Sequence, residues 1–117
     1  MWSPRGSQAE IAALQHAAPV FAALGDQTRL RLVARLCREG PLSISQLATG
    51  AGVTRQAVTK HLRVLAGAGL AHGERLGREQ LWQLEAAPLD AARRSLERIA
   101  QRWDEALARL QAAVEDG

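Results

Sequence analysis

The stretch PLSISQLATGAGVTRQAVTKHLRVLAGAGL, residues 41–70, contains a short helical pattern, a glycine turn and a second, longer helical pattern. We predict helices from Ser45 to Gly50 and from Thr54 to Ala68, because serine and threonine are good N-caps. The turn between the helices contains Gly52, which adopts a positive φ without steric cost. Two helices joined by a tight turn of this kind form a helix-turn-helix.

The second of these helices has two chemically different sides. At about 100° per residue, Val58, Leu62 and Leu65 fall on one side and favour packing. The opposite sector is polar and has no acidic residue; it holds Arg55, Gln56, Thr59, Lys60 and Arg63. Arginine and glutamine side chains fit base edges in the major groove, and the N-terminal half of such a helix enters that groove. A solvated polar face is the alternative interpretation, but the pattern favours contact with DNA.

A β-hairpin is predicted after this motif. Residues 71–76 and 80–84 have the alternation of short strands, and Gly77-Arg78-Glu79 is typical of a hairpin turn. Arg75 and Arg78 lie near the tip, where they could reach DNA phosphates or an adjacent minor groove. Alternatively, the hairpin only covers the edge of the core.

The rest of the chain predicts a single domain. Residues 1–7 are polar with proline and glycine, so we expect them to be disordered. Residues 8–117 are expected to form one winged-helix domain, with the motif and hairpin within residues 20–84. A helical pattern also covers residues 9–18, and Pro19 either ends it or begins a second short helix.

A helix is also predicted over residues 27–39, QTRLRLVARLCRE, with Asp26 as its N-cap. Its apolar residues are expected to be buried; they are Leu30, Leu32, Val33, Leu36 and Cys37. A buried free thiol at Cys37 would be ordinary, because cysteine packs as a small apolar residue.

Composition excludes several classes of protein. Hydrophobic residues make up 47% of the 117 residues and aromatic residues 3%, which suits a helical core of leucine, alanine and valine. No stretch approaches the roughly 20 apolar residues of a membrane span, and the N-terminus lacks the apolar region of a signal peptide. One cysteine excludes an internal disulfide, and no catalytic constellation is recognisable. We therefore expect a soluble cytoplasmic protein without enzymatic activity, and the net charge of +3 permits a polyanionic partner.

The C-terminal segment, residues 89–115, predicts one long helix with an apolar seam. Apolar residues recur at alternating steps of three and four, as in helices that pack against one another; they are Leu89, Ala92, Leu96, Ile99, Trp103, Leu107, Leu110 and Val114. The stripe could pack on the domain's own core, but it runs the full length of the helix. We predict a homodimer through this seam, completed by Ile11, Leu14 and Phe21 from the N-terminal segment.

Three segments together resemble the ArsR/SmtB family of winged-helix repressors. They are FAALGDQTRLRLVARL at 21–36, ISQLATGAGVTRQAVTKHLRVLAGAGL at 44–70 and GREQLWQL at 77–84. The resemblance implies a mostly α-helical winged helix-turn-helix with a small β-hairpin wing, dimerising through its N- and C-terminal helices. It also implies a bacterial repressor that binds double-stranded DNA and that an effector or a cellular state can release.

In that family the helix corresponding to residues 55–68 reads the operator, so Arg55, Gln56, Thr59 and Lys60 would be reading residues here. The expected DNA-binding set is Ser45, Gln46, Thr54, Arg55, Gln56, Thr59, Lys60, Arg63, Arg75 and Arg78. The leading hypothesis is a homodimeric repressor at an inverted-repeat operator. The alternative is a winged-helix interaction module whose basic face docks an acidic protein.

Metal-sensing relatives in this family resemble one another in a Cys-x-Cys stretch that leads into the first helix of the motif. In this sequence Ser43 and Ser45 occupy the matching positions. A serine hydroxyl is a poor ligand for soft or borderline metals. Residues 89–115 contain no histidine, so the family's other familiar metal site also lacks imidazole ligands. We therefore expect no metal cofactor, and no control of DNA binding by zinc, cadmium or arsenite; an organic ligand or a partner protein could serve as effector.

Overall fold

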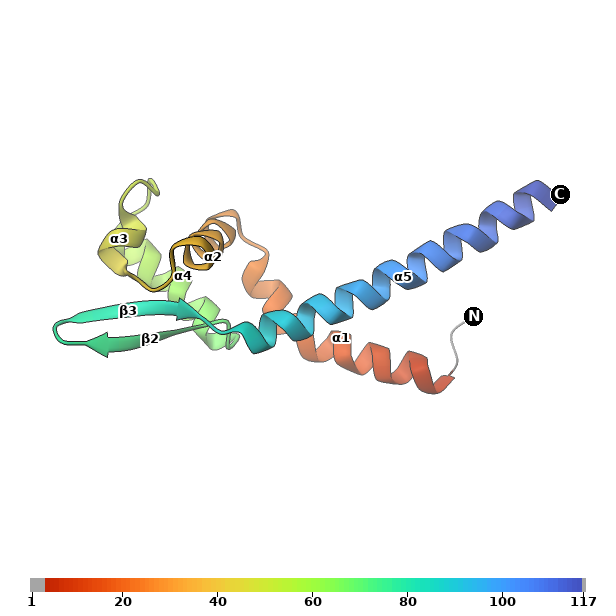
Figure 1. Cartoon of the computed structure of the whole chain (residues 1–117), viewed down its shortest axis with the longest axis horizontal. Helices are drawn as coiled ribbons and strands as arrows, with labels where there is room; N and C mark the ends of the chain where they lie inside the picture. Colours follow the sequence, from red (N-terminus) through yellow and green to blue (C-terminus); the bar gives the residue numbers. More distant parts are fainter. Residues whose placement is uncertain (1–3, 117) are drawn as a thin grey trace.

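The computed structural model of the chain describes residues 4–116 and is elongated, measuring 67 × 28 × 20 Å. Figure 1 shows the hairpin at one end of the molecule and a long C-terminal helix at the other. The elements are α1 (Pro4–Leu24), α2 (Gln27–Glu39), β1 (Leu42–Ser43), α3 (Ile44–Ala48), α4 (Arg55–Gly67), β2 (Ala71–Leu76), β3 (Glu79–Leu84) and α5 (Ala86–Asp116). The expected mostly α-helical winged helix-turn-helix fold is confirmed.

The beginning of α1 differs from the sequence prediction of disorder over residues 1–7. Residues 1–3 lie outside the described residues, whereas residues 4–7 are helical. Pro4 is the first residue of the helix, a position where the fixed φ of proline is favourable and its missing amide hydrogen costs nothing.

Pro19 lies inside α1, and the helix continues past it to Leu24. A proline inside a helix removes one backbone hydrogen bond and clashes with the preceding turn. Burial offsets this cost here, because Ala17, Val20 and Ala23 are all buried in the core on either side of the proline. The predicted break at Pro19 was therefore wrong, since tertiary packing outweighs a local preference.

The core lies between α1, α2, α3, α4 and the sheet. Leu32, Leu47, Leu62, Leu65 and Leu70 are each less than 2% exposed and form its centre. Such close-packed leucines fix the relative positions of the helices that carry them.

The helix α2 begins at the predicted cap, because an Asp26 carboxylate oxygen accepts a 3.0 Å hydrogen bond from the Arg29 amide. Its burial differs from the prediction, however. Leu32 and Leu36 are buried, whereas Leu30 is 50% exposed and Cys37 is exposed. Leu30 and Cys37 lie about 140–160° around the helix from Leu32, so they cannot share its narrow buried side.

The sheet has three antiparallel strands in the order β1-β3-β2. Leu76 pairs with Glu79, so the turn contains only Gly77 and Arg78, and Glu79 belongs to β3 rather than to the predicted turn. Gly77 has a φ of +65°, which suits the first central position of a type II′ hairpin turn. The backbone of this turn therefore holds Arg78 at the tip of the wing.

A close approach of two strands across the hairpin explains why residue 73 is a glycine. Gly73 lies opposite Trp82, and a Cβ at Gly73 would be 3.2 Å from the tryptophan Cε2 and 2.5 Å from Gln80 Nε2. Glycine at this position therefore leaves space for the buried Trp82 ring, which ties the wing to the core.

The helices α1 and α5 pack along one another, with Ala92 and Ser95 of α5 buried. Arg102 Nη2 donates to Glu10 Oε1 at 2.6 Å, and this hydrogen bond lowers the pKa of the Glu10 carboxyl. A lowered pKa means that the bond stabilises the fold at neutral pH and loses that effect as the pH falls through the folded-state pKa. Among residues 4–116, no helix has the length and apolar character needed to cross a membrane.

Candidate nucleic-acid interface

A capping box fixes the start of α3. Ser43 Oγ accepts a hydrogen bond from the Gln46 amide at 3.2 Å, and Gln46 Oε1 accepts one from the Ser43 amide at 2.9 Å. The N-cap is therefore Ser43, and the prediction that Ser45 caps this helix was wrong. Ser45 lies exposed in the first turn instead. The side chain of Gln46 is occupied by the cap, so it is less free to contact DNA than the sequence suggested.

Arg35 of α2 holds the other end of α3. Its Nη1 donates to the carbonyl oxygens of Gln46, Leu47 and Thr49 at 3.0, 3.2 and 3.4 Å. Its Nε donates to Glu39 at 2.9 Å. The last carbonyls of a helix have no partner within the helix, so this guanidinium satisfies them from outside. Sequence reasoning missed Arg35, because its partners lie 11 to 14 residues away and leave no local pattern.

Arg35→Ala is therefore expected to lower the free energy of unfolding by about 1–3 kcal/mol, since it leaves several α3 carbonyls without a charged donor. Urea unfolding followed by circular dichroism measures this change. Arg31→Ala is the matched control, because Arg31 is an exposed arginine of the same helix. Equal stability of the two variants would show that the Arg35 contacts do not hold α3.

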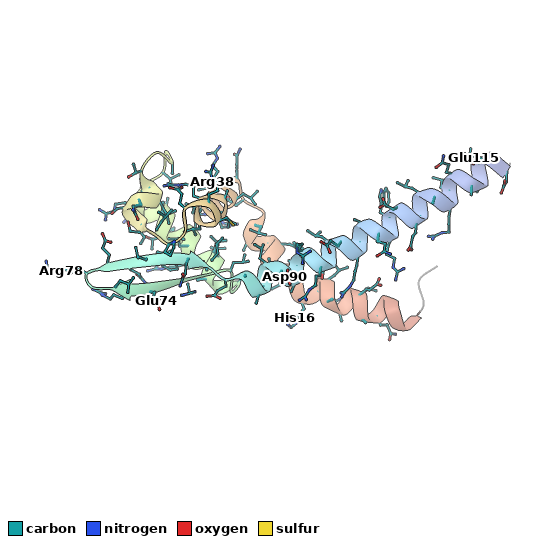
Figure 2. All side chains as sticks on the ribbon, in the orientation of Figure 1. His16, Arg38, Glu74, Arg78, Asp90 and Glu115 are labelled. Carbon is teal, nitrogen blue, oxygen red and sulfur yellow. The ribbon has the colours of Figure 1, made fainter. Side chains whose placement is uncertain are left out.

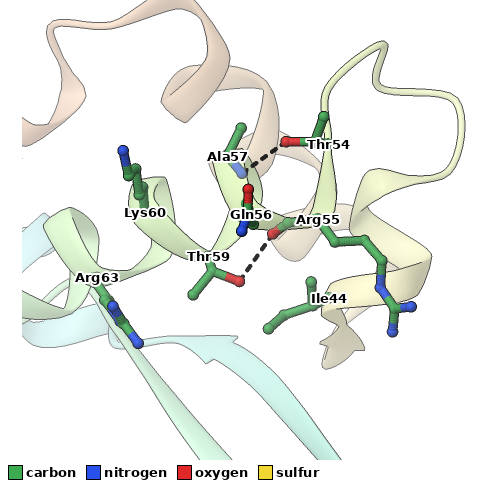
Figure 3. Close-up of a pocket in the computed structure, with 8 residues that line it drawn as sticks. All are labelled: Ile44, Thr54, Arg55, Gln56, Ala57, Thr59, Lys60 and Arg63. Carbon is green, nitrogen blue, oxygen red and sulfur yellow. Dashed lines mark hydrogen bonds between the residues drawn. The ribbon is translucent and has the colours of Figure 1, made fainter.

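The structure presents the predicted polar side of α4 to solvent. Thr54 caps the helix by accepting a 3.0 Å hydrogen bond from the Ala57 amide, as predicted. Val58, Leu62 and Leu65 are fully buried, which confirms the inward side. The outward side lines a hollow of about 750 Å³ with no acidic residue (Figure 3); the lining residues are Ile44, Thr54, Arg55, Gln56, Ala57, Thr59, Lys60 and Arg63.

Arg55 differs from the other polar residues of this face in its direction. Figure 3 shows its side chain extending away from Lys60 and Arg63. Its Nη2 donates to Ser45 Oγ at 2.6 Å, so the guanidinium lies over the first turn of α3. There it lines a second, smaller hollow of about 270 Å³ together with Arg78 from the wing. Ser43, Ile44, Ser45, Glu79 and Gln80 complete that hollow, which we call the α3–wing cleft.

The wing places its two arginines differently. Arg78 occupies the turn and stands at the far end of the hairpin (Figure 2). Arg75 pairs with Gln80 in the strand register and is exposed, but it lines neither hollow. Of the ten predicted DNA-binding residues, Gln46 and Arg75 thus stay outside the two hollows, and the other eight line one or both of them.

His61 lies on a side of α4 that faces α2. Its Nδ1 is 3.3 Å from Arg29 Nη1 and 3.8 Å from Asp26 Oδ2. Arg29 Nε in turn donates to the Ala23 carbonyl oxygen at the end of α1. His61 therefore belongs to the packing between α4 and the α1–α2 junction.

Within residues 4–116, no group of three or more histidine, cysteine, aspartate or glutamate side chains is placed to hold a metal ion. His72 pairs with the Glu85 carboxylate and lies 2.8 Å from the Gln83 amide nitrogen, so its imidazole has a local structural role. The expectation that metals do not control this protein stays a prediction.

The apolar stripe of α5 lies on the surface of the single chain. From Leu96 onward its residues are exposed, with fractions from 40% for Ile99 to 71% for Val114, and Trp103 is 64% exposed. Ile11 of α1 is 45% exposed, while Leu14 and Phe21 are half-buried. Two residues of the predicted seam are exceptions, because Ala92 is buried within the protomer and Leu89 is half-buried against its core. Most residues of the stripe therefore do not pack on the domain's own core, which was the alternative to a dimer interface.

Comparison with known proteins agrees with this architecture. A family model described as a helix-turn-helix domain matches residues 24–74. The HTH-type transcriptional regulator Rv2034 of Mycobacterium tuberculosis is 40% identical over 85 residues, covering 73% of this chain and 76% of that protein. An ArsR-like transcriptional regulator from Rhodococcus is 41% identical in sequence, with a TM-score of 0.71 over 84% of this chain and 92% of that one. This chain belongs to the ArsR family of winged helix-turn-helix transcriptional regulators.

One further solved structure bears on assembly. A homodimeric winged helix-turn-helix DNA-binding domain from Mycobacterium bovis has a TM-score of 0.60 and 26% identity, over 86% of this chain and 89% of that one.

Proposed function

We propose that this ArsR-family protein is a homodimeric repressor that binds an inverted-repeat operator with α4 in the major groove. The observation that carries the proposal is the exposed face of α4, which is polar, basic and free of acidic residues. DNA attracts such a face through its phosphates, and arginine, lysine and glutamine can read base edges. Similarity to regulators, including one described as a DNA-binding domain, supports this function.

The two hollows suggest a division of roles within the interface. Gln56, Lys60 and Arg63 are exposed on the outward side of α4, so we assign them, with Thr59, to the major groove. Thr59 donates its hydroxyl hydrogen to the Arg55 carbonyl oxygen and keeps acceptor capacity. In the α3–wing cleft, Arg55 and Arg78 can share one DNA phosphate, with Ser45 orienting the Arg55 guanidinium. The sequence predicts that Arg55 reads bases; we assign it instead to the phosphate backbone of DNA.

A twofold dimer follows from the apolar stripe of α5. Contiguous exposed apolar surface on a small domain typically marks an interaction site. A second copy would cover the exposed stripe residues, including Leu96, Ile99 and Trp103. The dimer would place two copies of α4 in successive major grooves, so the operator is expected to be an inverted repeat with half-sites one helical turn, or a multiple of it, apart. Homodimerisation of the Mycobacterium bovis domain supports this assembly.

Selection of genomic fragments that the purified protein captures, followed by fluorescence anisotropy, tests the proposal. We expect an inverted repeat among the selected fragments and at least a thousandfold preference for it over random duplex. Affinity for random duplex should fall steeply with salt, because binding releases counterions from the phosphates. Weak binding that is insensitive to salt on every fragment would instead favour docking of an acidic protein on the same face.

A further inference from the structure

A groove of about 800 Å³ runs between α1 and α5 and reaches the end of α4. Small residues line it, including Ala13, Ala17 and Ala91, and leave space between the helices. The buried Ser95 also lines it. We call this the flank groove; its volume lies within the range of small-molecule sites.

The flank groove differs chemically from one end to the other. One end is apolar and is lined by Val20, Ala68 and Pro88. The other end is lined by His16, Arg94 and Arg98, and no acidic residue lines the groove. Pro88 and Arg98 are ten positions apart on α5, which corresponds to roughly 15 Å along the helix. Figure 2 shows His16 on α1 close to the region where that helix passes α5.

The basic end of the groove has hydrogen-bond donors that existing contacts leave available. Arg98 forms no hydrogen bond or ion pair with any of the residues described, and neither does His16. Arg94 is 3.6 Å from an Asp90 oxygen, but Arg93 already binds that carboxylate at 2.7 Å. The charge of Arg98 contributes to the lowered pKa of Glu10, whose carboxylate is already bound by Arg102. An added carboxylate can therefore form charge-assisted hydrogen bonds here without breaking a strong existing pair.

The groove also stays open in the proposed dimer. Ala91 and Arg98 lie about 120–160° around α5 from Leu96 and Trp103, so the stripe and the groove face different directions. A second copy that covers the stripe leaves the flank groove exposed to solvent.

We propose that the flank groove binds an amphipathic organic monocarboxylate. The carboxylate lies between Arg94, Arg98 and His16, and the hydrocarbon lies against the alanines that line the groove toward Pro88. Gly67 and Ala68 end the reading helix and also line the groove. A bound molecule therefore touches α4 together with α1 and α5, the helices of the proposed dimer interface. If the proposed function holds, on which this step rests, the groove is an effector site.

Calorimetric titration of the full chain with octanoate, 1-octanol and octylammonium tests the site without DNA. We expect octanoate to bind at least tenfold more tightly than octanol, and octylammonium not to bind. The double variant Arg94→Gln/Arg98→Gln should lose at least tenfold in octanoate affinity, and Ala91→Phe should block the groove. Arg109→Gln is the matched control, because Arg109 is an exposed arginine of the same helix that does not line the groove.

Equal binding of octanoate and octanol, no binding of either, or equal losses in the test and control variants would overturn the proposed site. Anisotropy with operator DNA then tests the effector role, and octanoate is expected to change operator affinity severalfold. Tight octanoate binding with unchanged operator affinity would overturn that role alone. Because the titration needs no DNA, failure of operator binding would contradict the proposed function and leave the site itself standing.

Discussion

Ile99→Glu is expected to convert the proposed dimer into a monomer at micromolar concentration and to remove most operator affinity. Ile99 lies between Leu96 and Trp103 in the exposed stripe of α5, and a twofold interface would place the new carboxylate in both copies. An unpaired charge in an apolar interface costs several kcal/mol, and about 3 kcal/mol already weakens association more than a hundredfold. Trp103→Ala should act in the same direction, because it removes a large apolar side chain from the same stripe. Sedimentation equilibrium measures the mass, and anisotropy measures the affinity.

Leu76→Glu is the control for dimer mass. Leu76 is 60% exposed, but it lies next to the hairpin turn, far from α5 (Figure 1). Circular dichroism checks that each variant stays folded. If the unmodified protein is a dimer and Ile99→Glu and Trp103→Ala both keep its mass, the stripe is not the interface.

Gln56→Ala is expected to relax base preference at one position of each half-site, with a loss of about 1–3 kcal/mol on the preferred operator. Gln56 is exposed on the outward side of α4, and its carboxamide can donate and accept at once, as the edge of adenine requires. Binding to random duplex should hardly change, because an uncharged side chain adds nothing to counterion release. Affinities for a series of operators with single base changes measure the effect.

Arg78→Ala should behave differently, because Arg78 stands at the tip of the wing and lines the α3–wing cleft together with Arg55. Removal of a phosphate contact is expected to weaken binding to all sequences alike. It should also reduce the slope of log affinity against log salt concentration by about one. Equal losses on operator and random duplex for Gln56→Ala would show that it reads no base. A change of base preference for Arg78→Ala would show that the wing reads sequence.

Several features of this protein could be predicted from the sequence because their causes are local. The inward and outward sides of α4 follow from the helical period, which places Val58, Leu62 and Leu65 together. Asp26 and Thr54 cap their helices through residues three positions later. Gly52 has the expected positive φ, at +70° in the turn of the motif. Each of these depends on neighbours within one or two helical turns.

The start of α3 shows where local reasoning stops. Ser43 and Ser45 are both suitable caps by composition, and the choice between them depends on β1. Leu42 pairs with Trp82 and Ser43 pairs with Leu81, so the sheet fixes the point at which the chain leaves the strand and begins the helix. Trp82 lies forty positions after Leu42, and no pattern near the serines encodes that pairing.

The sequence by itself thus determined the order of the main helices and the hairpin, the two sides of α4 and the apolar stripe of α5, since periodicity and caps act over a few residues. Only the tertiary structure decided that Arg35 holds α3, that Arg55 turns toward Ser45, and that the flank groove forms. The physical reason is the same in each case. These features arise where side chains from different helices meet, and the positions of those helices depend on the packing of the whole core.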